Sequence, residues 1–184
     1  MDYMEPFNSL FNMNKLQLEP EGDLIVRRLT DMEGMYQKEN EAEGNPKIYE
    51  YYNVRLPEEP GHLQHCVTVI FPGKIGNEYH MTKGHYHEVE DTAEIYFTIQ
   101  GEGKLVMQTK DGDCKVLDMG EGIISYIPPY WSHRTINTGE NPLVFVGVYP
   151  GNAGHDYGNI EEQGMKKLVI EENGETKVIN NPDY

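Results

Sequence analysis

The chain has 184 residues, of which 38% are hydrophobic and 25% are charged, and its formal net charge is −16. This size and composition suit one soluble globular domain and argue against a disordered or low-complexity chain. With 31 acidic against 15 basic residues the chain repels phosphate backbones and anionic lipids, so we expect neither nucleic-acid nor membrane binding.

The predicted elements are short strands separated by Gly, Pro or Asp-Gly turns. Residues 1–62 form an irregular acidic extension with strand-like stretches at 23–29 and 48–54 and a surface loop at 39–46. A regular series follows, with expected strands at 64–71, 79–87, 93–100, 104–109, 114–119, 123–127, 134–137 and 143–149. Strands this short predict an all-β sandwich or barrel, here a single domain with its core at about residues 63–150.

The C-terminal segment, residues 151–184, is expected to add a hairpin. Residues 167–171 and 177–179 are strand-like and flank Asn173-Gly174, and an Asn-Gly pair between strand-like runs is a strong hairpin signal. We find no internal repeat and no linker that would divide the chain.

Two features bear on the cellular compartment. Cys66 and Cys114 form no C-x-x-C pair and no disulfide framework, so we interpret them as reduced thiols. Residues 1–12 lack the basic and apolar regions of a signal peptide. We therefore expect a cytoplasmic protein.

Three histidines and one glutamate have the spacing of a metal site. His85 and His87 are two residues apart, so on a strand they would point to the same face. Glu94 is expected on the neighbouring strand of a hairpin, and His133 follows some forty residues later. This set suits a divalent ion such as Fe, Mn, Ni or Zn. Exposed surface histidines are the alternative, but an inward-facing carboxylate needs a partner. The other isolated histidines are interpreted as surface or packing residues: His62, His65 and His80.

The same residues resemble two cupin signatures. The second signature is matched by Gly122, Pro128, His133 and Asn137, with Tyr130 in place of its second glycine. The first is matched by His85, His87, Glu94 and Gly101, with Tyr79 at its opening glycine and a longer interval between His87 and Glu94. The resemblance implies a cupin, jelly-roll-like β-barrel that binds a metal and has a long turn in its first hairpin.

A narrower resemblance covers nearly the whole chain. Residues 82–87 (TKGHYH), 128–135 (PPYWSHRT) and 153–158 (AGHDYG) are similar to the archaeal-type, metal-dependent cupin glucose-6-phosphate isomerases, as are 27–34 and 170–175. The resemblance implies interconversion of glucose 6-phosphate and fructose 6-phosphate, in glycolysis and gluconeogenesis, by a homodimer. It implies one divalent ion per subunit, with Fe²⁺ preferred and Ni²⁺, Mn²⁺ or Zn²⁺ as alternatives.

By the same resemblance, each site residue receives an expected role. The metal ligands would be His85, His87, Glu94 and His133, and Glu94 and His155 would be catalytic. The substrate would contact Tyr49, Thr68, Thr82, Gly84, Tyr96, Tyr149 and Tyr157. These are neutral donors, which can hold a phosphate dianion in a nest-like pocket. Lys83 and Arg134 adjoin the motif as further candidates.

The reaction route stays open at this point, as do two other functions. Glu94 could carry a proton between C2 and C1 of the sugar, or hydride could pass directly between the carbons. A cupin oxygenase that uses Fe and O₂ would share the same ligands. A non-enzymic sugar-binding cupin is the second alternative, because one fold hosts many functions.

Overall fold

The computed structural model describes residues 4–19 and 22–184. Residues 1–3, which begin the segment predicted above not to be a signal peptide, and residues 20–21 lie outside the described part. In the described part, the structure contains mostly strands, and no helix is long and apolar enough to cross a bilayer.

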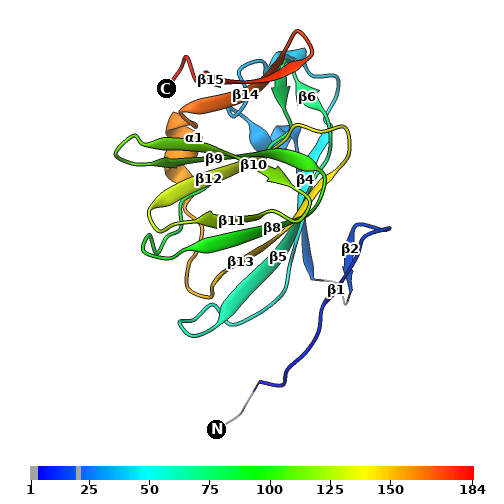
Figure 1. The fold of residues 1–184 in the computed structure, drawn as a ribbon, viewed down its shortest axis with the longest axis vertical. Coiled ribbons are helices and arrows are strands. Elements are labelled where there is room, and N and C mark those ends of the chain that lie inside the picture. The colour runs from blue at the N-terminus through cyan, green and yellow to red at the C-terminus, as the bar shows by residue number, and fades with distance from the viewer. Residues whose placement is uncertain (1–3, 20–21) are drawn as a thin grey trace.

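Two sheets face each other and form the barrel (Figure 1). The larger sheet has the order β11 (Ile124–Ile127), β8 (Glu94–Gln100), β13 (Leu143–Pro150), β5 (Leu63–Ile70), β4 (Lys47–Asn53) and β3 (Asp23–Arg28). The smaller has the order β10 (Cys114–Gly120), β9 (Glu102–Thr109) and β12 (Trp131–Asn137). The expected all-β, jelly-roll-like barrel is confirmed.

Smaller elements surround the barrel. One further sheet has the order β15 (Glu175–Asn180), β14 (Lys167–Glu172), β7 (Glu78–Tyr79) and β6 (Lys74–Ile75), and its β14–β15 pair is the predicted C-terminal hairpin. The sequence reading did not predict the hairpin of β1 (Leu10–Asn12) and β2 (Gln17–Glu19), the helix α1 (Gly158–Gln163), or the 3-10 turns Leu29–Met32 and Glu39–Glu41. The turn Glu39–Glu41 begins the segment 39–46, which was expected to be a loop.

Side-chain alternation gives the six-stranded sheet two different faces. On β8, Tyr96 is buried inside the barrel, whereas Phe97 is exposed on the outside. The inner face packs against residues such as Leu105 of β9 and forms the main core. On the outer face a second cluster includes Val67 of β5, and Phe11 of the β1–β2 hairpin packs against it. The hairpin thus covers one part of the outer face.

The segment 79–87 differs from the single strand that the sequence predicted. β7 ends at Tyr79, and beyond it only isolated bridges form, among them His85 with His133. The break has a local cause, because Gly84 has a φ of +79°, a left-handed conformation that favours glycine. The expectation that Glu94 lies on a strand paired with this segment is wrong. β8, which begins at Glu94, pairs with β11 and β13.

Candidate functional site

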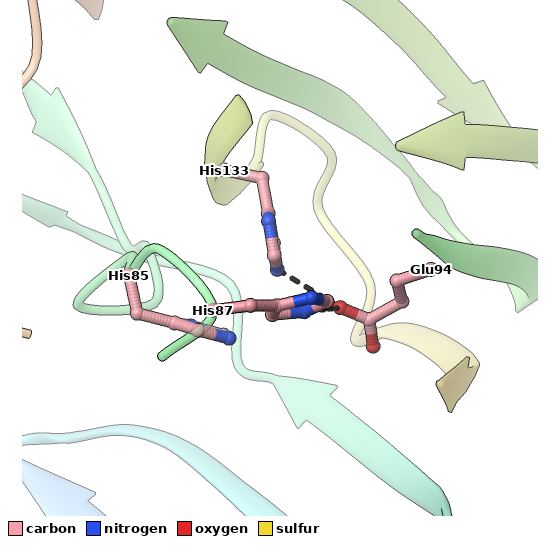
Figure 2. A group of neighbouring side chains, drawn as sticks. All are labelled: His85, His87, Glu94 and His133. Carbon is pink, nitrogen blue, oxygen red and sulfur yellow. Dashed lines mark hydrogen bonds and ion pairs between the residues drawn. The ribbon is translucent and has the colours of Figure 1, made fainter. Parts of the chain in front are cut away.

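Four side chains from three parts of the chain converge at one point inside the barrel (Figure 2). His85 and His87 come from the bridged segment, Glu94 begins β8, and His133 lies on β12. One ligand atom from each residue lies within 4.8 Å of the others. The predicted set is therefore assembled, although a bridge between His85 and His133, and not a regular strand, brings the first two histidines into place.

The kink at Gly84 is required by this convergence. A Cβ atom at Gly84 would lie 3.1 Å from the carbonyl oxygen of His133 and 3.1 Å from Cβ of Arg134, which is tighter than ordinary contact. Glycine allows the bridged segment to approach β12 closely enough for His85 and His133 to pair, with ring centroids 4.4 Å apart.

Glu94 is the only carboxylate in this four-residue group, and it is buried. Its Oε2 lies 3.3 Å from Nε2 of His87 and 3.0 Å from Nε2 of His133. Burial raises the pKa of Glu94, but the interactions with His133 and His87 outweigh it and bring the pKa to about 2. The carboxylate is therefore ionised at neutral pH.

The hydrogen bonds of His87 determine which of its nitrogens carries the proton. Nδ1 lies 2.8 Å from Oγ1 of Thr92, and that hydroxyl donates its hydrogen to the carbonyl of Val89 at 2.6 Å. Nδ1 must therefore be the donor, which leaves Nε2 of a neutral His87 as an acceptor facing the Glu94 carboxylate. Two acceptors that face each other need a cation between them.

Two further ligand atoms make no hydrogen bond of acceptable geometry, although one of them, Nε2 of His133, lies 3.0 Å from Oε2 of Glu94. Nε2 of His85 and Nε2 of His133 are buried and make no hydrogen bond. Such atoms are costly unless they bind something else. Together with the paired acceptors of His87 and Glu94, they fit a divalent metal ion, for which three imidazoles and a carboxylate are suitable ligands. This His/Glu group can bind a metal.

A cavity of about 550 Å³ opens beside these ligands. Its wall contains every residue that was expected to contact substrate, together with the second candidate catalytic residue: Tyr49, Thr68, Thr82, Gly84, Tyr96, Tyr149, Tyr157 and His155. The structure thus brings the predicted residues together, and their individual roles stay predictions. Three more wall residues were missed: Tyr51, Cys66 and Phe145. Alternation along β4 and β5 would have found the first two, because they lie two residues from Tyr49 and Thr68.

The cavity wall presents neutral hydroxyl groups. Burial raises the pKa of Tyr49 to about 12, and it raises the pKa of Tyr149 and of Tyr157 further, so all three stay protonated. Thr82 accepts a hydrogen bond from the backbone N–H of Thr135 at 3.0 Å, which leaves its own hydrogen free to donate. These groups can donate to an anion without being charged.

His155 lies at the mouth of the cavity, against the metal ligands. Its ring centroid is 4.6 Å from that of His85 and 5.5 Å from that of Tyr149, and it stacks on Tyr157 at 6.1 Å. One side of His155 is exposed to solvent, yet desolvation by these rings lowers its pKa. A mostly neutral imidazole in this position can accept or donate a proton.

The two basic residues considered beside the motif are engaged elsewhere. Lys83 lies in the wall, with its Nζ 3.0 Å from Oε1 of Glu161. Arg134 is buried, and its Nε and Nη2 donate to the carbonyl of Lys83 at 2.9 and 2.6 Å. These two hydrogen bonds from Arg134 therefore anchor the backbone at Lys83, directly before Gly84.

Known proteins with similar sequences share one description. The family model described as "Glucose-6-phosphate isomerase (GPI)" matches residues 26–184. The chain is 45% identical to the glucose-6-phosphate isomerase of Thermococcus litoralis, covering 100% of this chain and 99% of that one. It is 48% identical to the glucose-6-phosphate isomerase of Pyrococcus furiosus, covering 99% and 98%. It is 34% identical to the putative glucose-6-phosphate isomerase 1 of Rhizobium meliloti, covering 86% and 78%.

Solved structures are more distant. The oxalate decarboxylase of Lactobacillus farciminis in a formate complex aligns with a TM-score of 0.47 at 18% identity, covering 59% of this chain and 30% of that one. A double-stranded beta-helix protein of Klebsiella pneumoniae aligns with a TM-score of 0.44 at 25% identity, covering 56% and 78%.

Proposed function

The chain belongs to the glucose-6-phosphate isomerase family, and we propose that it interconverts glucose 6-phosphate and fructose 6-phosphate with a divalent metal ion. The observation that carries the metal dependence is the convergence of three buried imidazole nitrogens and one carboxylate. Nε2 of His85 makes no hydrogen bond, and Nε2 of His87 and of His133 face Oε2 of Glu94 at 3.3 and 3.0 Å. The ion we propose is Fe²⁺, and Ni²⁺, Mn²⁺ or Zn²⁺ would suit the same ligands.

The cavity supports a phosphorylated sugar as the substrate. The hydroxyls of Tyr49, Thr68 and Thr82 and the backbone N–H of Gly84 would hold the phosphate. Tyr96, Tyr149 and Tyr157 would then contact the sugar between the phosphate and the metal ligands.

Glu94 is the base in this proposal. When bound, the metal supplies a Lewis acid that polarises the sugar oxygens. Oε2 of Glu94 points to the imidazoles of His87 and His133, whereas Oε1 lies on the side of Gly147. Oε1 can therefore take the proton from C2 and return it to C1 while Oε2 keeps its position. His155 at the cavity mouth would move the proton between O1 or O5 and solvent during ring opening.

Isotope exchange separates the proton route from direct hydride transfer. Conversion in deuterated water should place deuterium on the carbon that receives the proton, because a carboxylic acid exchanges with solvent. Complete retention of the original hydrogen would favour the hydride route.

We also propose a homodimer formed by the outer face of the six-stranded sheet. Ile124 is 65% exposed, Phe97 is 43% exposed, and they are register partners on β11 and β8. The β1–β2 hairpin covers only the other end of this face, and the chain before β1 extends away from the barrel with Phe7 exposed (Figure 1). A second copy would cover both the apolar patch and the edge of β11. The two free cysteines accord with a cytoplasmic location.

A single assay distinguishes the isomerase from a cupin oxygenase and from a sugar-binding protein. Metal-loaded protein is given fructose 6-phosphate with and without O₂, and glucose 6-phosphate formation is measured together with O₂ consumption. We expect equal isomerisation in both conditions and no O₂ consumption. Absence of turnover in both would refute the proposed function.

A further inference from the structure

The cavity described above has hydroxyl donors for a phosphate dianion, but its two neighbouring cations are engaged. Lys83 pairs with Glu161, and Arg134 donates to the carbonyl of Lys83. In a chain with a net charge of −16, an anion that enters this cavity meets an unfavourable field. A free positive charge close to the hydroxyl donors would offset that field.

Arg27 on β3 has the required position. It is the register partner of Tyr49 on β4, and Tyr51 lies two residues further along that strand. Because side chains at i and i+2 share a face, all three lie on the inner face of the sheet. The electrostatic neighbours of the Arg27 guanidinium are Tyr49, Tyr51 and Tyr157, which all line the cavity.

Contacts with the tyrosines link Arg27 to the cavity. Its guanidinium interacts electrostatically with the hydroxyls of Tyr49 and Tyr51. The backbone of Lys83 also interacts with the Tyr49 hydroxyl. A hydroxyl whose oxygen faces a positive charge has its own hydrogen left to donate. Arg27 thus orients the tyrosine O–H groups away from itself and into the cavity.

Arg27 has unused capacity for an anion. Its Nε is buried without a hydrogen-bond partner. Among residues 4–19 and 22–184, no carboxylate forms an ion pair with it. The adjacent Arg28 differs, because alternation along β3 leaves it exposed, and its Nη1 donates to the carbonyl of Asn45 at 3.1 Å. An unpaired guanidinium directly behind the tyrosines that line the cavity indicates a functional charge.

We infer that Arg27 determines specificity for phosphorylated over free sugars, by placing its positive charge and the hydroxyls of Tyr49 and Tyr51 at the substrate phosphate. This inference rests on the proposed function, because it assigns the phosphate of that substrate to this side of the cavity. Arg27 takes no part in moving the proton, so its loss should affect binding more than the chemical step.

The test compares Arg27→Gln with Arg28→Gln, which change the net charge equally. We expect Arg27→Gln to raise KM for fructose 6-phosphate about 10- to 100-fold, because one charged hydrogen bond to the substrate is lost. The change in kcat should be much smaller. Arg28→Gln should match the wild type, and Arg27→Lys should recover part of the lost affinity.

Binding of inorganic phosphate, measured by isothermal titration of the metal-loaded protein, gives a readout that does not require turnover. Arg27→Gln should weaken it, and Arg28→Gln should not. Equal phosphate affinity in the two glutamine variants would overturn the inference, and so would an Arg27→Lys variant as weak as Arg27→Gln. A wild type that binds phosphate through Arg27 but does not isomerise would refute the proposed function alone.

Discussion

Gly147 on β13 leaves the space that the Glu94 carboxylate occupies. A Cβ atom at Gly147 would lie 2.9 Å from Oε1 of Glu94, and 3.1 and 3.2 Å from the side chains of Tyr96 and Cys66. The backbone of Gly147 has no left-handed conformation, so the requirement is purely steric. The position of the Glu94 carboxylate at the metal centre therefore requires glycine, which has no side chain, at position 147 of the neighbouring strand.

Gly147→Ala should displace Glu94 and weaken metal binding. We expect metal affinity to fall about tenfold or more, the size of effect seen when a ligand loses its orientation. The overpacked core should also lose about 1–3 kcal/mol of unfolding free energy. Competition with a chelator measures the affinity. Gly120→Ala is the matched control, because a Cβ there would meet only Ile123 at 3.5 Å. Equal metal affinity in the two variants would contradict the steric account.

Thr92→Val should weaken metal binding by a different cause. The valine is close in size to threonine but lacks the hydroxyl that accepts the Nδ1 proton of His87 at 2.8 Å. The ring keeps only the longer contact to the backbone carbonyl of residue 92 at 3.3 Å, so its orientation is held less firmly. We expect metal affinity to fall about 10- to 100-fold by calorimetric titration, while Thr92→Ser keeps the wild-type value. A Thr92→Val variant with unchanged affinity would show that other contacts fix the ring.

Much of the fold could be predicted from the sequence, and the exceptions have physical causes. Period-two patterning located β8, since one buried face dictates its alternation, and an apolar run between turn signals located β13. The segment leading to His87 was expected to be a strand because its composition is strand-like, but the left-handed Gly84 prevents a regular ladder. Local patterning also could not show that Glu94 faces His133 across the barrel.

The cavity wall was predictable where residues belong to a motif and unpredictable elsewhere. His155 was placed near the site by its motif, and it packs against His85. Arg27 begins the family-like segment 27–34 but was given no role, and only the register of β3 with β4 brings it to Tyr49. Cross-strand partners depend on the order of strands in the sheet, which short-range sequence signals do not encode.

Acid should destabilise the metal-free protein through its buried histidines. Burial lowers the pKa of His80, and it lowers that of His85 to well below the usual value of 6.5. Below about pH 6.5 the unfolded chain therefore binds more protons than the folded one, and stability falls as the pH falls. Urea unfolding at several pH values should show this decline. His80→Gln should reduce its steepness, and stability that stays constant from about pH 8 to about pH 5 would contradict the prediction.

Phe97→Lys should dissociate the proposed dimer. A charge in the centre of an apolar interface is costly when buried, whereas on an exposed surface it is tolerated. We expect light scattering to give the mass of two chains for the wild type and of one chain for the variant. Leu117→Lys, at a position 39% exposed on β10 of the other sheet, is the control and should remain dimeric. A dimeric Phe97→Lys would place the interface elsewhere.

Metal removal and restoration test the central claim most directly. The protein is treated with a chelator, its metal content is measured, and the conversion of fructose 6-phosphate is followed before treatment, after it, and after addition of about one equivalent of Fe²⁺ per chain. We predict that turnover disappears with the metal and returns with the added ion. His133→Ala should bind little metal and should not be rescued. Full turnover by wild-type protein that contains no metal would contradict the account.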